Sequence, residues 1–243
     1  LVPAAREGVR LGDSALVDAM IHDGLWDVYS DQHMGLTGEL VADKYGIDRE
    51  AQDACAALSH ARATAAWDAG KFDAETFAVE VPQRKGDPVS FTRDEGVRAD
   101  VNEESLAGLR PAFKKDGSVT PGNASQISDG AAAAVLASPE AVKSMGLEPL
   151  ARITGYAAGG TSPEMVMMAP RFAVENLEAR TGLSRHDFDL IEMNEAFAAG
   201  SCALIGAMEL DAEKVNVHGG AIAIGHPIGA SGARLLTTLV HAL

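Results

Sequence analysis

A histidine stands in a glycine-rich loop late in the chain. The loop reads Gly-His-Pro-Ile-Gly-Ala-Ser-Gly over 225–232 and follows the apolar stretch 221–224, which we expect to be a strand. Glycines permit tight turns and let the backbone approach a ligand closely. The imidazole of His226 could therefore donate to a carbonyl oxygen on which negative charge develops. Loss of one such donor typically costs about 10²- to 10³-fold in rate.

The same loop leads into a helical pattern, and Ser231 is a candidate cap for that helix. The first turn of a helix offers free N–H groups and the positive end of the helix dipole. Both features favour an oxyanion at this position.

A carboxamide follows a second expected strand. The stretch 189–193 is predominantly apolar, and Asn194 begins the sequence Asn-Glu-Ala-Phe that enters an expected helix. Ligand-handling residues of open α/β sheets cluster at the carboxyl ends of strands. We therefore expect Asn194 and His226 to converge on one small site.

The histidine loop has two other interpretations. A histidine in a glycine-rich turn can be purely structural, and a turn of this kind before a helix can also cradle a dinucleotide. The loop lacks the Gly-x-Gly-x-x-Gly spacing, however, and no acidic residue follows about 20 positions later. The dinucleotide interpretation is therefore disfavoured.

The elements that must position these residues alternate between strand and helix from residue 151 onward. The pattern predicts a helix at 170–180, a final helix after the histidine loop, and strands at 151–156, 189–193, 215–218 and 221–224. This alternation predicts an α/β sheet with helices on its faces. Upstream, we expect a helix from a cap at Asp48 to Gly70, a strand at 77–81, loops over 92–125, and a buried strand or tight helix at 130–137.

Composition narrows the possible partners. The 243 residues carry a formal net charge of −15, which argues against nucleic acid and against an anionic membrane surface. No apolar run reaches the ~20 residues that a membrane span requires. Two isolated cysteines do not make a disulfide framework, so a reducing cytosol is the default location. We predict no metal site and no resident cofactor.

Four blocks of the sequence, taken together, resemble the signature stretches of the thiolase family and occur in the family's order. They span 33–42, 109–133, 194–200 and 216–234. The resemblance implies a layered αβαβα thiolase-like fold, incomplete at both ends of this chain. It also implies a loop domain covering coenzyme A at 1–127, the tail of the first core domain at 128–150, and a second core domain at 151–243 that lacks its last strands.

The resemblance further implies chemistry on coenzyme A thioesters. Thiolases condense two acyl-CoA molecules, or cleave a 3-oxoacyl-CoA with CoA, through a cysteine-bound acyl group. By resemblance, His226 activates that cysteine and helps bind the thioester oxygen, and Asn194 holds a water in the same oxyanion hole. The His-Met-Gly loop and the Gly-Asn-Ala-Ser sequence favour the short-chain, acetyl-CoA acetyltransferase type, a transferase of fatty acid metabolism.

The resemblance to thiolases also implies which residues of this chain contact coenzyme A. Arg84 matches a basic contact to the nucleotide end, and Ser125 matches a contact to the pantetheine arm. Positions that line the pantetheine tunnel are His33, Met34, Leu25, Phe113, Ala196 and Phe197. The sequence departs from the family at 166–169, where Val-Met-Met-Ala replaces the usual Met-Gly-x-Gly, so acyl-chain length stays open.

The largest departure concerns the two catalytic cysteines. The family's nucleophile block lies upstream of Leu1 and its second cysteine block lies beyond Leu243, while Cys55 and Cys202 fit apolar helix positions. We therefore expect this chain alone to be inactive and the full-length protein to be a cytoplasmic homodimer or homotetramer. The alternatives are a longer-chain 3-ketoacyl-CoA thiolase, a β-ketoacyl synthase (disfavoured because its block reads Gly-His-Thr), a non-catalytic thioester-binding module, and a non-functional fragment.

Overall fold

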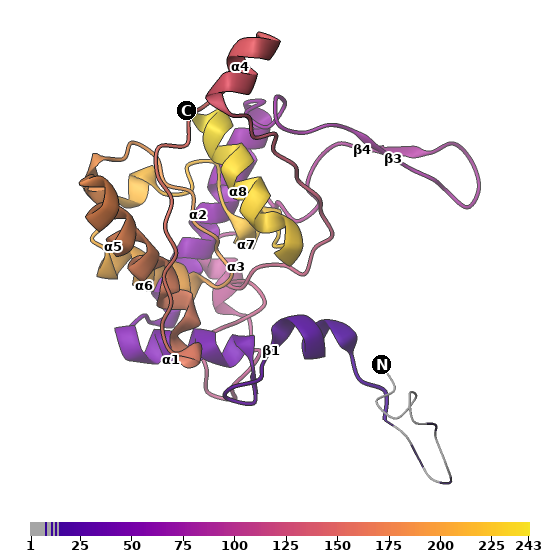
Figure 1. Cartoon of the computed structure of the whole chain (residues 1–243). Coiled ribbons are helices and arrows are strands. Elements are labelled where there is room, and N and C mark those ends of the chain that lie inside the picture. The colour runs from indigo at the N-terminus through magenta and orange to yellow at the C-terminus, as the bar shows by residue number, and fades with distance from the viewer. Residues whose placement is uncertain (1–7, 9–10, 12, 14) are drawn as a thin grey trace.

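Helix α2 (Arg49–Asp68) runs through the middle of the molecule and contacts helices on several sides (Figure 1). The computed structural model describes residues 8, 11, 13 and 15–243, so the other residues of the predicted 1–127 domain lie outside the described part. The carboxylate of Asp48 accepts the N–H of Ala51 at 2.8 Å and caps α2. Gly70, just past its end, has a φ of 68°. The sequence predicts both helix-end signals, and the structure confirms them.

Loss of the Asp48 cap is expected to destabilise the chain modestly. Asp48→Ala leaves the first-turn N–H of Ala51 without its acceptor, and such caps are typically worth about 1 kcal/mol. Urea unfolding followed by circular dichroism measures this loss. Asp48→Asn, which keeps the acceptor oxygen, is the matched control and should stay near wild type. Equal losses in the two variants would contradict the capping role.

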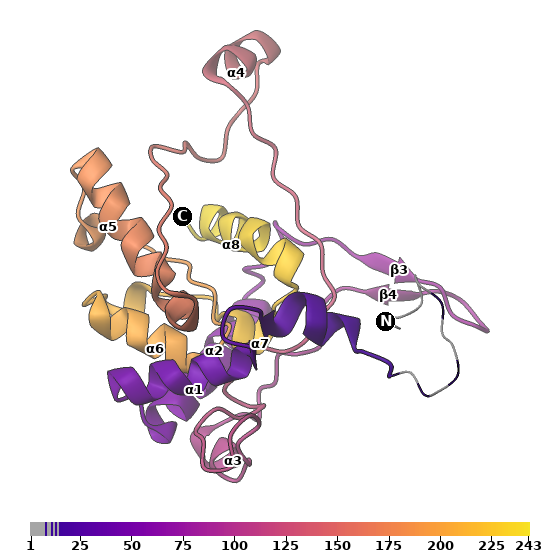
Figure 2. The same ribbon diagram turned by 60° about the horizontal axis from the view of Figure 1, so that its bottom comes forward.

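The other helices are α1 (Met34–Tyr45), α3 (Glu103–Ala107), α4 (Pro139–Met145), α5 (Ala169–Thr181), α6 (Ala198–Ala207), α7 (Ala221–Ile224) and α8 (Ile228–Ala242). Helices α3, α6 and α7 pack against α2, α4 projects from the body (Figure 2), and most helices lie in the second half of the chain. Short π- and 3₁₀-helical turns occur at Ile21–Leu25 (η2), Pro163–Met168 (η3), Arg185–Asp187 (η4) and Ala212–Lys214 (η5). The predicted helices at 170–180 and after the histidine loop are confirmed. No helix among the described residues is long and apolar enough to cross a membrane.

Two short antiparallel pairs form the sheets of the described residues. β1 (Trp26–Asp27) pairs with β2 (Gln32–His33), and β3 (Val79–Val81) pairs with β4 (Val89–Phe91). The second pair is a hairpin that extends away from the helical body (Figure 2). It confirms part of the strand predicted at 77–81.

Several strand predictions are wrong for this chain. The stretch 151–156 is extended but exposed and unpaired within the described residues, and 130–137 is likewise extended, with Val135 95% exposed. Between 189–193 and 215–218 the pairing is a single parallel bridge from Ile191 to Val215. A strand needs a neighbouring backbone to form its ladder, and apolar composition alone supplies none.

The predicted strand at 221–224 is instead helix α7. The carboxylate of Glu195 accepts the N–H of Ile222 at 3.3 Å, in the first turn of α7. At the other end, the side-chain amide of Gln126 donates to the carbonyl oxygens of Ile222 and Ala223. Side chains from elsewhere in the chain thus satisfy both ends of a single helical turn, which its short apolar sequence did not reveal.

Two buried clusters hold the helices together. One lies around α1, α6 and η3 and includes Val41, Met165, Met168 and Leu204. The other lies where α2, α3, α6 and α7 meet, and consists of Ala56, Leu106, Ala198 and Ile222, each no more than 2% exposed. This second cluster fixes α7, and therefore the loop that follows it, against the centre of the molecule.

Candidate active site

The structure brings Asn194 and His226 into contact. The side-chain nitrogen Nδ2 of Asn194 lies 3.2 Å from Nε2 of His226. Asn194 precedes α6 and His226 lies between α7 and α8, so two segments distant in sequence meet at one point. The sequence predicts this convergence, although through a strand at 221–224 that the structure replaces with a helix.

Gly225 positions the histidine. Its φ of 97° lies in a region that side chains rarely adopt, and a Cβ atom there would lie 2.2 Å from Oγ of Ser128. The backbone N–H of His226 donates to the carbonyl of Gln126 at 3.3 Å, which ties the loop to the segment beside it. Only glycine fits this turn, and the turn aims the imidazole toward Asn194.

The hydrogen bonds of Ser231 determine which ring nitrogen carries the proton. The hydroxyl of Ser231 donates to the carbonyl of Pro227 at 3.0 Å and lies 2.6 Å from Nδ1 of His226. Since its own proton is used, the hydroxyl accepts from Nδ1–H, which leaves a lone pair on Nε2. Ser231 was predicted to cap the final helix, but α8 begins earlier, at Ile228. That prediction is wrong, because the side chain orients the imidazole instead.

Electrostatics keep this imidazole neutral. Burial lowers the pKa of His226, and the positive charge of Arg234 lowers it further. A neutral imidazole whose Nε2 lone pair faces only the side-chain amide of Asn194 can exchange that contact for a proton from a nucleophile. Once protonated, the same nitrogen becomes a donor to a developing oxyanion.

Asn194 carries an unused acceptor at this site. Its Oδ1 is buried and has no hydrogen-bond partner among the described residues. A buried amide oxygen without a donor is costly, so a bound water or a polar group of a ligand would be favoured there. Asn194 can thus hold a polar ligand group on one side while its Nδ2 contacts His226 on the other.

The residue after Asn194 anchors this segment to three others. Glu195 is 5% exposed, and its carboxylate accepts from Oγ of Ser59 at 2.6 Å, from Nδ2 of Asn216 at 2.7 Å and from the N–H of Ile222. Burial raises the pKa of Glu195, while the bonds from Ser59 and Asn216 oppose that rise. Sequence analysis missed Glu195, although it belongs to the Asn-Glu-Ala-Phe block.

A buried ion pair links the segment of Asn194 to the helix that follows the histidine loop. Glu192 lies 3.5 Å from a guanidinium nitrogen of Arg234 on α8, and the Glu192 side chain is 3% exposed. Burial raises the pKa of Glu192 to about 7, the negative charges of Glu195 and Glu75 contribute to that rise, and Arg234 opposes it. Arg234 thus belongs to this ion pair and also lowers the pKa of the catalytic candidate His226.

Glu192 is expected to make the stability of the chain fall as pH rises. The folded protein holds its proton up to about pH 7, whereas an unperturbed glutamate releases it near 4.5. The folded state therefore binds more protons between these values, and stability decreases across them by about 3 kcal/mol. Glu192→Gln should flatten this decrease in unfolding experiments at pH 5 and pH 8.

The matched control for this pH dependence is Glu80→Gln, which alters an exposed glutamate on β3. Its stability should fall between the two pH values as much as that of the wild type. Parallel pH profiles for wild type and Glu192→Gln would rule out the role assigned to Glu192.

Most residues predicted to contact coenzyme A lie together. The ring of His33 stacks on Phe113 with centroids 4.8 Å apart, and Phe113 meets Phe197 edge to face at 6.1 Å. The N–H of Ser125 donates to the carbonyl of Ala196 at 2.9 Å. Their contact with bound coenzyme A stays a prediction, and His33 has an additional task, since its Nδ1 caps α1 by accepting from Gly35.

The other three residues predicted to contact coenzyme A are Met34, Leu25 and Arg84. Met34 begins α1 beside His33, and Leu25 ends η2, a segment that approaches Ile228 at the start of α8. Arg84 lies between β3 and β4, in the hairpin that extends from the body, and is exposed (Figure 2). The structure of this chain therefore does not bring Arg84 to the Asn194–His226 pair.

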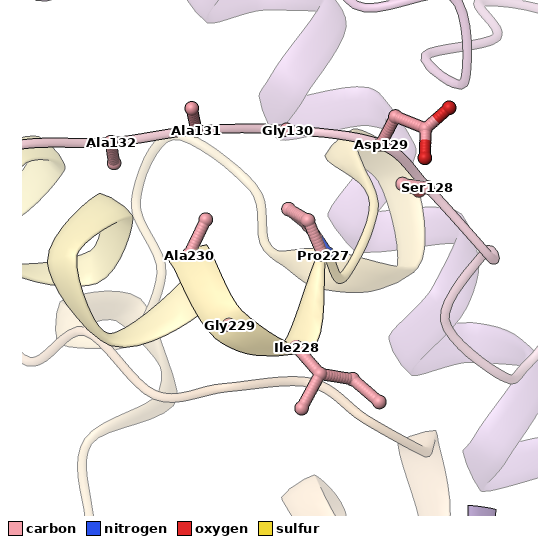
Figure 3. A pocket seen from close by; sticks show the side chains of 9 residues that line it. All are labelled: Ser128, Asp129, Gly130, Ala131, Ala132, Pro227, Ile228, Gly229 and Ala230. Atoms are coloured by element: carbon pink, nitrogen blue, oxygen red, sulfur yellow. The ribbon is translucent and has the colours of Figure 1, made fainter. Parts of the chain in front are cut away.

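A hollow of about 450 Å³ adjoins the histidine loop. It is bounded by the extended segment 128–132 on one side and by 227–230 at the start of α8 on the other (Figure 3). Pro227 and Ala230 point toward the extended segment, and the carboxylate of Asp129 points away from α8. Sequence analysis named no residue of 128–132 as a site residue, although the block at 109–133 leads into it.

Comparison with known families identifies the chain. Residues 1–140 match the family model described as "Thiolase, N-terminal domain", and residues 147–243 match "Thiolase, C-terminal domain". The chain belongs to the thiolase family. Its histidine loop and its Asn-Glu-Ala-Phe block both lie within the part that matches the C-terminal domain.

Relatives of this thiolase chain include proteins named acetyl-CoA acetyltransferase. It is 52% identical over 241 residues to the "Acetyl-CoA acetyltransferase" of Pseudomonas aeruginosa, and 54% identical over 241 residues to that of Cupriavidus necator. Each match covers 99% of this chain and 61% of the relative. The thiolase chain thus spans about three fifths of the length of these relatives.

Solved structures confirm the α/β thiolase fold. The acetyl-CoA acetyltransferase of Bacillus anthracis superposes with a TM-score of 0.95 at 43% identity, over 98% of this chain and 60% of that one. Human mitochondrial 3-ketoacyl-CoA thiolase in complex with CoA gives a TM-score of 0.91 at 40% identity, over 100% of this chain and 60% of that one. The chain therefore has the thiolase arrangement of elements, although its described residues form only two short strand pairs.

The two cysteines of this thiolase chain lie between helices. Cys55 is on α2 and Cys202 is on α6, and both are partly buried. Cys55 packs against the cluster of Ala56 and Ala198, as its predicted core position implies. The Sγ of Cys202 donates to the carbonyl of Ala51 at 3.7 Å, so its contact is with α2.

Proposed function

We propose that the complete protein containing this chain is an acyl-CoA acyltransferase of the thiolase type. It condenses two acetyl-CoA molecules, or cleaves a 3-oxoacyl-CoA with CoA, in two half-reactions that share an acyl-cysteine. The observation that carries this proposal is the 3.2 Å contact between Asn194 and His226, next to the buried, unpartnered Oδ1 of Asn194. The acetyl-CoA acetyltransferases at 52 and 54% identity support the short-chain type.

His226 performs two successive tasks in this proposal. Its neutral Nε2 takes the proton of the nucleophilic thiol, because Ser231 holds the other nitrogen as a donor. The protonated imidazole then donates from Nε2 to the thioester oxygen as that oxygen becomes negative. Asn194 holds a water whose hydrogen bond supports the same oxygen.

The chain of 243 residues is proposed to be inactive in thiolysis when it is alone. Cys202 contacts the backbone of α2, and Cys55 packs against Ala56 and Ala198. In these positions the thiols serve the packing of α2 and α6, and the nucleophile of the complete protein is a different cysteine. The chain binds acyl-CoA and coenzyme A as substrates and needs no resident cofactor.

Membership of the thiolase family also supports proposals for the domains, the oligomeric state and the location of the complete protein. We propose that residues 1–127 cover coenzyme A, that 128–150 end the first core domain, and that 151–243 contribute the second. The complete protein is proposed to be a cytoplasmic homodimer or homotetramer that acts in fatty acid metabolism.

A hybrid enzyme tests the proposed function. This chain replaces the matched residues of the Pseudomonas aeruginosa acetyl-CoA acetyltransferase, which leaves the rest of that protein intact. We expect the purified hybrid to cleave acetoacetyl-CoA with CoA, measured by the loss of the substrate's absorbance. A folded hybrid with the oligomeric state of its parent that binds CoA without turnover would favour a non-catalytic thioester-binding module and overturn the proposal.

A further inference from the structure

The two cysteines form a contact that the thiolysis chemistry does not use. Helices α2 and α6 pack closely because alanines face one another between them, with Ala56 and Ala198 both fully buried. Cys55 and Cys202 project into this same contact from opposite sides. Sγ of Cys202 reaches the carbonyl of Ala51 on α2, one turn before Cys55, and each thiol shifts the pKa of the other, so the two side chains are neighbours in the folded chain.

The bond pattern gives the two thiols different reactivities. Sγ of Cys202 lies 3.7 Å from the carbonyl of Ala51, one helical turn before Cys55. Interaction with Cys55 lowers the pKa of Cys202, whereas interaction with Cys202, together with burial, raises the pKa of Cys55. Cys202 is therefore the more readily ionised sulfur of the pair.

A small cavity adjoins Cys55, the member of the pair that lines it. The cavity has a volume of about 40 Å³, and Ser201, the residue before Cys202, lines it together with Arg62 and Glu195. This volume suffices for a molecule the size of water or hydrogen peroxide. Both cysteines are partly buried rather than enclosed, which excludes large oxidants more than small ones.

We propose that Cys55 and Cys202 are a redox-sensitive pair that forms a reversible intrachain disulfide on exposure to a small peroxide. The thiolate of Cys202 attacks one oxygen of hydrogen peroxide, the O–O bond breaks, and Cys202 becomes a sulfenic acid as one water leaves. The sulfur of Cys55 then attacks the sulfur of Cys202, and the sulfenic oxygen leaves as a second water. Two thiols lose two hydrogens, and the peroxide is reduced to two waters.

The disulfide would connect two parts of the molecule that support the candidate site. α6 begins three residues after Glu195, and α2 carries Ser59, which donates to Glu195. Oxidation therefore links α6, which follows Asn194, to α2, whose Ser59 holds Glu195 in place. The inference stands on the packing of α2 and α6 and does not depend on the proposed thiolysis.

Mass spectrometry of the 243-residue chain tests the pair. The chain is treated with a small excess of hydrogen peroxide, digested without reductant, and its free thiols are titrated. We expect both thiols to disappear together, a peptide that joins Cys55 to Cys202, a monomer on a non-reducing gel, and full recovery of both thiols with dithiothreitol.

Two serine variants show which thiol reacts first. In Cys55→Ser, Cys202 should still form a sulfenic acid that a dimedone probe traps, because its reaction with peroxide comes first. In Cys202→Ser, Cys55 should react far more slowly. Thiols lost independently, oxidation of Cys202 to a sulfinic acid while Cys55 stays free in the wild type, crosslinks only between chains, or no loss of thiols would each overturn the proposal.

Discussion

Replacing His226 with alanine is expected to lower the thiolysis of acetoacetyl-CoA by about 10²- to 10³-fold in the hybrid enzyme. The variant removes Nε2, which lies 3.2 Å from Asn194 and serves first as proton acceptor and then as donor to the thioester oxygen. Because both tasks belong to the reaction rather than to the binding of CoA, kcat should fall far more than KM rises.

His186→Ala is the matched control for this loss. His186 lies in η4, is exposed, and takes part in its turn through its backbone N–H rather than its ring. Its activity should remain close to that of the unaltered hybrid. If His226→Ala retained activity within about twofold of the unaltered hybrid, the role assigned to His226 would be refuted.

Replacing Glu195 with alanine is expected to be the most damaging change to stability. It leaves the hydroxyl of Ser59, the amide of Asn216 and the N–H of Ile222 buried without their common acceptor. Each orphaned donor costs about 1–3 kcal/mol, so we expect the free energy of unfolding to fall by about 3–5 kcal/mol. Urea unfolding of the 243-residue chain measures this loss.

Glu195→Gln separates the lost hydrogen bonds from the lost volume. Asn216 cannot turn to suit the new amide, because its side chain also bonds both backbone groups of Met193. The glutamine therefore loses one of the three bonds, at about 1–2 kcal/mol. Glu80→Ala, on the exposed strand β3, should stay within about 0.5 kcal/mol of wild type. A Glu195→Ala loss no greater than that of Glu195→Gln would contradict this network.

Structure that is decided by local chemistry can be predicted from the sequence. The ends of α2 depend on Asp48 and Gly70, which act within one turn of the helix, and both are readable from residue type and spacing. The Asn194–His226 contact was predicted from two polar residues that each follow an apolar stretch. That prediction survives although the stretch before His226 is helical, because either element ends by directing the chain into the same site.

Contacts between distant segments explain what the sequence could not reveal. α7 is helical because Glu195 and Gln126 satisfy its two ends, and neither residue is its neighbour in sequence. Ser231 orients an imidazole rather than a helix end because the loop folds it back on His226. The meeting of Cys55 and Cys202 depends wholly on the packing of α2 against α6. Arg84 lies between β3 and β4, and the direction in which this hairpin leaves the body (Figure 2) is likewise set by tertiary structure.

A double-mutant cycle in the hybrid enzyme tests the central claim, that Asn194 and His226 act as one oxyanion-binding unit. The cycle compares kcat/KM for thiolysis in the unaltered hybrid, Asn194→Ala, His226→Ala and the double variant. We expect each single change to cost about 10²-fold or more and the double change to cost little beyond the larger single loss. Losses that multiply fully in the double variant, or an Asn194→Ala variant with unaltered activity, would contradict the claim.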